Sequence, residues 1–150
     1  MNVIWKTGTW PQEYRIFRDK VITGILKKNT WKAQAYGEFN GAMLRFRSEG
    51  FWKNKTIISD IEGTKDLGNI EYDSWKASGK VTFMDETYEW KYDSWKGNKW
   101  SIGNKNGSAN YTVTNFWKGE GTIEFEDIPP AVVLTGLFID DHFRALSAAV

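Results

Sequence analysis

The segment from residue 131 to residue 139 constrains the fold of this chain more than any other. It reads Ala-Val-Val-Leu-Thr-Gly-Leu-Phe-Ile, and Thr135 is its one polar side chain. Asp127 and two prolines stand just before it, as a capping residue and a first-turn proline would. A helix over about residues 129–146 would have no polar face along this segment, so it needs burial on all sides. The apolar stretch is also far too short to span a bilayer.

The rest of the chain shows the alternation that is typical of half-buried β-strands. Polar and apolar residues alternate in 88–93 (Tyr-Glu-Trp-Lys-Tyr-Asp) and in 123–126 (Ile-Glu-Phe-Glu). Turn sequences rich in Gly, Asn and Asp separate such runs, for example at 39–41, 60–63 and 104–107. We count about twelve candidate strands between residues 3 and 126, and no linker divides the 150 residues.

A closed sheet is the arrangement in which about twelve short strands surround one apolar helix. A barrel of about this size is wide enough to need filling, and closure removes the exposed sheet edges. We therefore predict one all-β domain over residues 1–150. It is a closed antiparallel barrel of about twelve strands around a buried hydrophobic C-terminal helix.

Tryptophan is followed by lysine seven times among its nine occurrences, where the lysine content of the chain gives about one by chance. Most of these pairs recur with a period near 22 residues, which fits one hairpin per repeat. Adjacent strand residues face opposite sides, so we interpret the pairs mainly as a core tryptophan beside a solvent lysine. The pentapeptide Tyr-Asp-Ser-Trp-Lys occurs at 72–76 and 92–96. Whether its Trp75 and Trp95 tuck under the barrel end or stand out as aromatic contacts stays open.

Lysines beside the expected turns form a candidate ligand site. If they gather at one end of the barrel, they would meet phosphate headgroups; otherwise they are scattered solubilising charge. With Trp75 and Trp95, the candidate ligand-binding residues are Lys27, Lys28, Lys53, Lys55, Lys96, Lys99 and Lys105.

Signals of catalysis are weak. Asp140 and Asp141 precede the single histidine, His142, but neighbours along a helix point in different directions. We interpret them as the polar end of the helix, emerging from the barrel, rather than as a metal site or an acid–base pair. Glu124 and Glu126 share one strand face, which favours a solvated surface over a glycosidase pair. We expect no catalysis, no cofactor and no metal.

Net charge and composition limit the classes of partner that we expect for this protein. Twenty basic and nineteen acidic residues give a net charge of +1, which predicts no dominant attraction to nucleic acid. There is no cysteine, and the N-terminal sequence has no signal-peptide pattern. We expect a cytoplasmic protein without a transmembrane segment, which lipid binding would place at a membrane surface. The oligomeric state is left open.

Two local sequences carry a family resemblance. One is Ile-Ser-Asp-Ile-Glu-Gly at 58–63 followed by Leu-Gly-Asn-Ile at 67–70; the other is the proline-led apolar helix at 129–146. Together with the expected layout, they make the chain resemble the Tubby C-terminal-like superfamily, which includes the LURP-one-related proteins and the phospholipid scramblases. The resemblance implies a lipid- or membrane-associated binding module, with phosphoinositide binding in the Tubby proteins. We place none of their phosphoinositide-contacting residues on positions of this chain.

The sequence thus supports a non-catalytic binding module for anionic lipid headgroups or for another protein. The alternative is a lipocalin-like carrier of a small hydrophobic molecule, indicated by the Gly-x-Trp pattern at 8–10. In that layout the helix packs outside and the lumen holds the ligand. The missing polar face of residues 131–139 argues against it. A hydrolase that uses Asp140, Asp141 or paired glutamates ranks last.

Overall fold

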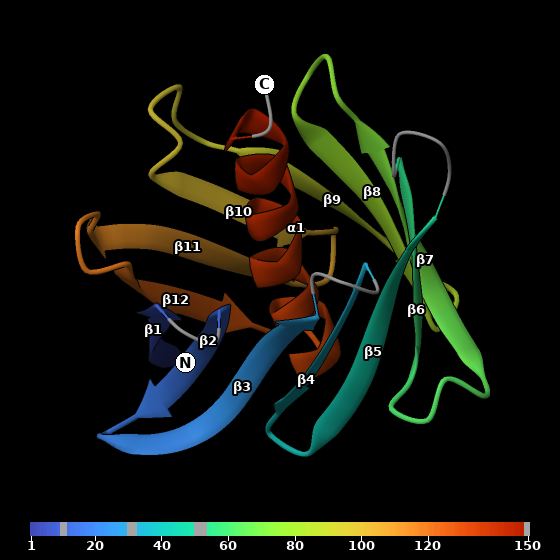
Figure 1. The fold of residues 1–150 in the computed structure, drawn as a ribbon, viewed down its shortest axis with the longest axis horizontal. Coiled ribbons are helices and arrows are strands. Elements are labelled where there is room, and N and C mark those ends of the chain that lie inside the picture. The colour runs from blue at the N-terminus through green and yellow to red at the C-terminus, as the bar shows by residue number, and fades with distance from the viewer. Residues whose placement is uncertain (10–11, 30–32, 50–53, 149–150) are drawn as a thin grey trace.

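The computed structural model describes residues 1–9, 12–29, 33–49 and 54–148, which form twelve β-strands and one α-helix (Figure 1). The helix α1 spans Pro130–Ala148. The strands are β1 (Asn2–Thr9), β2 (Gln12–Arg18), β3 (Val21–Asn29), β4 (Gln34–Phe39), β5 (Ala42–Glu49), β6 (Lys55–Asp60), β7 (Asp66–Asp73), β8 (Ser78–Phe83), β9 (Glu86–Tyr92), β10 (Lys99–Gly103), β11 (Ser108–Asn115) and β12 (Glu120–Glu126).

The sheet closes on itself. Each strand is antiparallel to its neighbours in chain order, and β12 returns to pair with β1, where Val3 lies opposite Ile123. A closed sheet has no free edge along which another chain would pair. The predicted closed antiparallel barrel with its C-terminal helix is confirmed, and the helix begins and ends within two residues of the expected positions.

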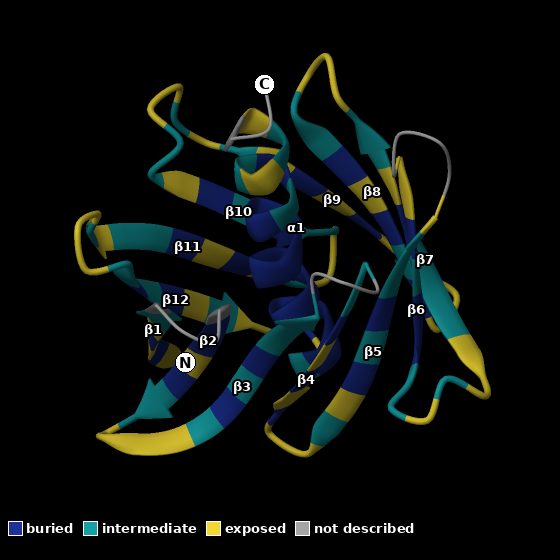
Figure 2. Cartoon of the chain, in the orientation of Figure 1, coloured by how far each residue is buried: buried dark blue, intermediate teal, exposed yellow. Residues whose placement is uncertain are grey.

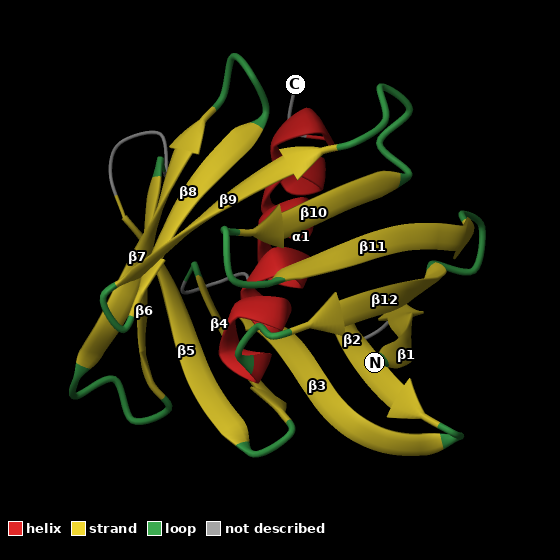
Figure 3. Ribbon diagram, turned by 180° about the vertical axis from the view of Figure 1, so that it is seen from behind, coloured by secondary structure: helices red, strands yellow, loops and turns green. Residues whose placement is uncertain are grey.

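The meander places alternate connections at opposite ends of the barrel. Odd-numbered strands run toward one end and even-numbered strands run away from it. Three connections at this end are described in full: 74–77 between β7 and β8, 93–98 between β9 and β10, and 116–119 between β11 and β12. Each contains one tryptophan, and we call the end that they form the tryptophan rim. Because β12 runs away from this rim, α1 enters at the opposite end and its C-terminal end lies at the tryptophan rim (Figures 1 and 3).

The helix occupies the interior of the barrel. Every residue from 131 to 141 is buried, and Figure 2 shows this part of α1 in dark blue inside the strands. Strand side chains close around it in the expected alternation: Tyr88 and Trp90 on β9 are buried, whereas Glu89 and Lys91 between and after them are exposed. The lipocalin-like layout, with the helix outside an open lumen, is therefore wrong for this chain.

Polar contacts of aromatic side chains fix the helix in the barrel. The indole nitrogens of Trp90 and Trp100 both donate hydrogen bonds to the carbonyl oxygen of Gly136, at 3.0 and 3.1 Å. The Tyr111 hydroxyl donates to the Val133 carbonyl oxygen at 2.6 Å. Tyr111 also packs so closely on Gly136 that a side-chain carbon at that position would collide with its ring. Glycine at 136 is thus required by the close approach of β11 to the helix.

Candidate functional site

Three tryptophans stand out from the tryptophan rim with almost their whole surface in solvent. Trp75, Trp95 and Trp117 are 100%, 93% and 99% exposed, one in each of the three described turns. By contrast, the tryptophans within strands β1, β9 and β10 are buried; these are Trp5, Trp90 and Trp100. Exposed single apolar residues are ordinary on protein surfaces, but three fully exposed indoles on three consecutive hairpins form a set that points to an interaction surface.

A short local sequence builds each of these turns. In the first, the Asp73 carboxylate accepts hydrogen bonds from the amides of Trp75 and Lys76, at 3.1 and 3.2 Å. In the second, the Ser94 hydroxyl accepts from the Lys96 amide at 3.2 Å. In the third, the Asn115 side chain accepts from the Lys118 amide at 3.0 Å. Such side-chain to backbone bonds fold the chain into a tight turn, which turns the tryptophan outward.

Each turn ends with a residue whose backbone adopts the left-handed conformation. The residue two positions after the tryptophan has a positive φ in all three turns: Ala77 (50°), Gly97 (72°) and Gly119 (66°). This conformation closes the hairpin and returns the chain to the next strand. The shared pattern is therefore Asp or Asn, any residue, Trp, Lys, and then Ala or Gly, except that Ser94 rather than Asp93 caps the second turn.

The structure divides the Trp-Lys pairs into two kinds. The interpretation as core tryptophan beside solvent lysine is correct for Trp5 and Trp90, which lie on strands. It does not hold for Trp117, and the open question about Trp75 and Trp95 is answered, since both stand out from the barrel end; turn residues do not alternate between the two faces of a sheet. Trp31, Trp52 and Trp10 lie outside the described residues.

The two copies of the pentapeptide are anchored by their tyrosines, which point inward. The Tyr72 hydroxyl lies 2.8 Å from the Thr56 hydroxyl, and its ring stacks on His142 with centroids 3.8 Å apart. The Tyr92 hydroxyl donates to the Asp140 carboxylate at 3.0 Å. Each copy is therefore an inward tyrosine followed, three residues later, by an outward tryptophan.

The predicted lysines are distributed over both ends of the barrel. Five of them, Lys27, Lys28, Lys55, Lys96 and Lys99, lie at the tryptophan rim or on strand ends beside it. Lys105 lies in the connection between β10 and β11, at the opposite end, so the predicted lysines do not all gather at one end. Lys53 lies outside the described residues.

Some of the lysines near the tryptophan rim form ion pairs within the protein, and others do not. Lys28 Nζ lies 2.5 Å from an oxygen of the buried Asp141, and Lys27 Nζ lies 4.0 Å from Glu13. Within the described part of the chain, no ion pair involves Lys76, Lys96 or Lys118, the lysines that follow the three exposed tryptophans. All three are exposed. These cations remain available to an external anion.

Sequence reasoning missed half of this site. It selected Trp75, Trp95 and Lys96, but not Trp117, Lys76 or Lys118. The signal was present in Asn-Phe-Trp-Lys at 115–118, which has a capping residue and a Trp-Lys pair in the same register as Asp-Ser-Trp-Lys at 73–76. Phe116, 61% exposed, adds a fourth aromatic ring to the rim.

The acidic residues at the helix end do not emerge from the barrel as expected: Asp140 and Asp141 are both buried, and they have structural partners on different sides. Asp140 is 1% exposed and accepts hydrogen bonds from Tyr92 and from Arg144, whereas Asp141 faces Lys28 and Tyr14. Burial raises the pKa of Asp140, although the Arg144 charge opposes this shift. Burial and then the Asp140 charge raise the pKa of Tyr92, so its hydroxyl keeps its proton and acts as the donor.

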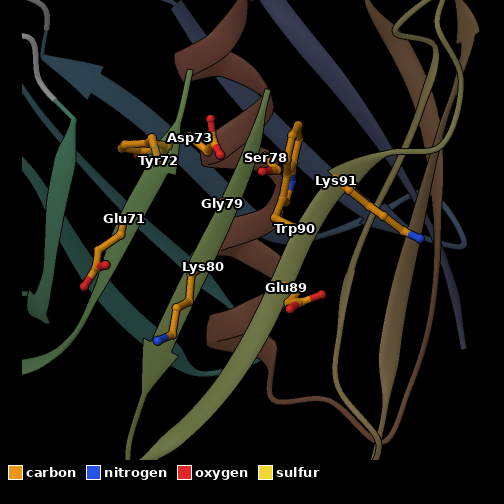
Figure 4. A pocket seen from close by; sticks show the side chains of 9 residues that line it. All are labelled: Glu71, Tyr72, Asp73, Ser78, Gly79, Lys80, Glu89, Trp90 and Lys91. Carbon is orange, nitrogen blue, oxygen red and sulfur yellow. The ribbon is translucent and has the colours of Figure 1, made fainter. Parts of the chain in front are cut away.

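The paired glutamates of β12 and a depression on β7, β8 and β9 are two further features of the molecule. Glu124 and Glu126 are exposed on the outer face of β12, as expected. No three His, Cys, Asp or Glu side chains converge in the described ranges as a metal site would need. A shallow depression of about 440 Å³ lies on β7, β8 and β9. Its charged side chains, Glu71, Lys80, Glu89 and Lys91 among them, diverge rather than meet at one point (Figure 4).

Comparisons with protein-family models, with curated proteins and with solved structures give no match to this chain. The resemblance to the Tubby C-terminal-like superfamily therefore stays a prediction. Over the residues that are described, no helix has both the length and the apolar character needed to cross a membrane.

Proposed function

We infer that this protein is a non-catalytic binding module that attaches to anionic phospholipid surfaces through the tryptophan rim. One observation carries the proposal: Trp75, Trp95 and Trp117 are fully exposed on consecutive hairpins, and each is followed by an exposed lysine without an ion pair in the described structure. Tryptophan is enriched at membrane–water interfaces, where the ring meets apolar groups and the indole N–H stays hydrated. Lysine beside it supplies attraction to anionic headgroups.

The magnitudes favour the tryptophans as the main source of affinity. A tryptophan side chain buries roughly 150–250 Å², which corresponds to about 4–6 kcal/mol at full burial. A lysine near an anionic membrane surface contributes only about 1 kcal/mol, and salt screens that contribution. Partial insertion of three indoles thus outweighs the three lysines. The lysines then determine the preference for anionic over neutral lipid.

A bilayer suits this rim better than a protein partner does. The three indoles project from separate turns, and a protein surface would need three pockets at matching positions to receive them. A bilayer interface accepts indoles at any lateral spacing. The proposed resemblance to the Tubby-like barrels points to lipid association as well.

Carriage of a small hydrophobic molecule has less support. Such a carrier needs a lumen for its ligand, and here α1 fills the space inside the strands from residue 131 to residue 141. The apolar surface that this protein offers is on its rim instead.

Vesicle co-sedimentation tests the proposal. We expect binding to vesicles of phosphatidylcholine with 20% phosphatidylserine, and much weaker binding to phosphatidylcholine alone. The variant with Trp75, Trp95 and Trp117 all changed to Ala should lose most of this binding. Its matched control replaces three exposed apolar residues at the opposite end, Val21, Ile22 and Met84, by Ala and should bind like the wild type.

Equal and negligible binding to both kinds of vesicle would contradict the proposal and favour a protein partner. Equal losses in the two triple variants would show that the tryptophan rim is not the contact surface. Because the substituted side chains are exposed, both variants should keep the wild-type melting temperature, which thermal unfolding verifies.

A further inference from the structure

The helix end holds the turn of Trp95 at two points. Before the tryptophan, the Tyr92 hydroxyl donates to Oδ1 of Asp140 at 3.0 Å. After it, Nη2 of Arg144 donates to the carbonyl oxygen of Gly97 at 2.8 Å. Asp140 and Arg144 are joined to each other, because Nε of Arg144 donates to Oδ2 of Asp140 at 2.7 Å. Both ends of the turn are therefore connected to one ion pair on α1.

The same arginine also contacts the neighbouring turn. Its guanidinium carbon lies 5.3 Å from the ring centroid of Phe116, the residue before Trp117, and 5.7 Å from that of Trp100. A guanidinium over an aromatic face is attracted by the ring and stacks on it. Arg144 thus touches the turns that present two of the three exposed tryptophans.

The ion pair of Asp140 and Arg144 connects the buried interior of the barrel to the exposed rim. Asp140 is buried in the barrel, whereas the Arg144 side chain is about one-third exposed at the rim. Hairpin tips without such contacts are among the least stable parts of a fold. Holding them in place before binding reduces the conformational freedom that is lost on binding.

We propose that Arg144 is a positioning residue of the membrane-binding rim. Together with Asp140 and Tyr92, it clamps the turns of Trp95 and Trp117 so that both indoles meet the bilayer in one orientation. The proposal rests on the function proposed above. It assigns to Arg144 a role that is separate from direct attraction to anionic headgroups, since the guanidinium acts through the two turns.

Three conservative substitutions test the clamp. Arg144→Lys keeps the charge and can still pair with Asp140, but the ammonium lacks the planar fork that reaches Asp140 and Gly97 together. Tyr92→Phe removes only the hydroxyl that holds the start of the turn. Tyr14→Phe is the matched control, because its hydroxyl bonds Asp141 at the same helix end, and no hydrogen bond among the described residues joins it to either turn.

Two measurements are made on each variant. Binding to vesicles with 20% phosphatidylserine should weaken about fivefold in Arg144→Lys and about twofold in Tyr92→Phe, with no change in Tyr14→Phe. Amide hydrogen exchange without lipid should speed up at Asp93, Gly97 and Lys118, whose amides bond within the two turns. This acceleration is expected in Arg144→Lys and is absent in Tyr14→Phe.

Unchanged exchange and unchanged binding in Arg144→Lys would overturn the clamp while the proposed function stands. Equal effects in Tyr14→Phe would also overturn it, because they would reflect general loosening of the helix end. A wild-type protein that ignores vesicles would instead overturn the proposed function, and the role of the clamp in binding with it.

Discussion

Trp90 and Trp95 lie five residues apart in one hairpin, and each is followed by lysine, yet their environments are opposite. Trp90 is 1% exposed and donates a hydrogen bond to the helix, whereas Trp95 is 93% exposed at the rim. Trp90 lies on β9, where alternation directs it inward, and Trp95 lies in a turn built by Ser94 and Gly97. The same residue type therefore serves the core or the surface according to the local backbone, and the two groups should respond differently to substitution.

The largest expected difference is in stability. Trp100→Ala removes a fully buried indole and leaves a cavity beside Gly136, which should lower the free energy of unfolding by about 3–5 kcal/mol. Trp95→Ala should change it by less than about 0.5 kcal/mol, since that side chain is exposed. Chemical denaturation of the two variants measures both values. A loss of several kcal/mol in Trp95→Ala would mean that the rim tryptophans support the fold.

The lysines provide the next comparison, in membrane affinity. Replacing Lys76, Lys96 and Lys118 by Gln should weaken binding to anionic vesicles about a hundredfold, at about 1 kcal/mol for each charge. The control replaces three exposed lysines at the opposite end, Lys20, Lys65 and Lys105, and lowers the net charge equally. Co-sedimentation over a range of salt concentrations should show a reduced salt dependence only in the rim variant. Equal losses in both variants would indicate an unspecific effect of net charge.

Two buried glycines test how tightly the interior of the protein is packed. Gly136→Ala should destabilise the protein by about 1–3 kcal/mol, because the new methyl group collides with Tyr111. Gly79→Ala should be nearly neutral, since the nearest atoms to its added carbon lie at 3.7–3.8 Å, an ordinary contact distance. Thermal unfolding of both variants tests this difference. A neutral Gly136→Ala would mean that β11 has room to move away from the helix.

The fold was predictable because two strong constraints agreed. An apolar helix without a polar face needs an enclosing sheet, and the period-2 alternation in segments such as 88–93 supplied the strands. The rim was only partly predictable. Alternation decides the direction of a strand residue such as Trp90, but the direction of Trp117 depends on the Asn115 cap and the left-handed Gly119. The contact between Arg144 and Gly97 joins residues 47 positions apart, and nothing in the local sequence indicates it.

The smallest expected effect is on the pH dependence of stability. It concerns Asp140, which lies where the barrel interior meets the rim. Burial raises the pKa of Asp140 above its ordinary value of 3.8 in the folded protein. Between 3.8 and this raised value, the folded chain retains a proton that the unfolded chain has released, so the free energy of unfolding falls as the pH rises. The contribution of Asp140 is thus fully present below pH 3.8 and is lost as the pH passes its folded pKa. Denaturant unfolding at several pH values should show that the wild type loses stability relative to Asp140→Asn, which cannot titrate, as the pH rises through this range. A steeper decline in Asp140→Asn would mean that the Arg144 charge outweighs burial and lowers the Asp140 pKa instead.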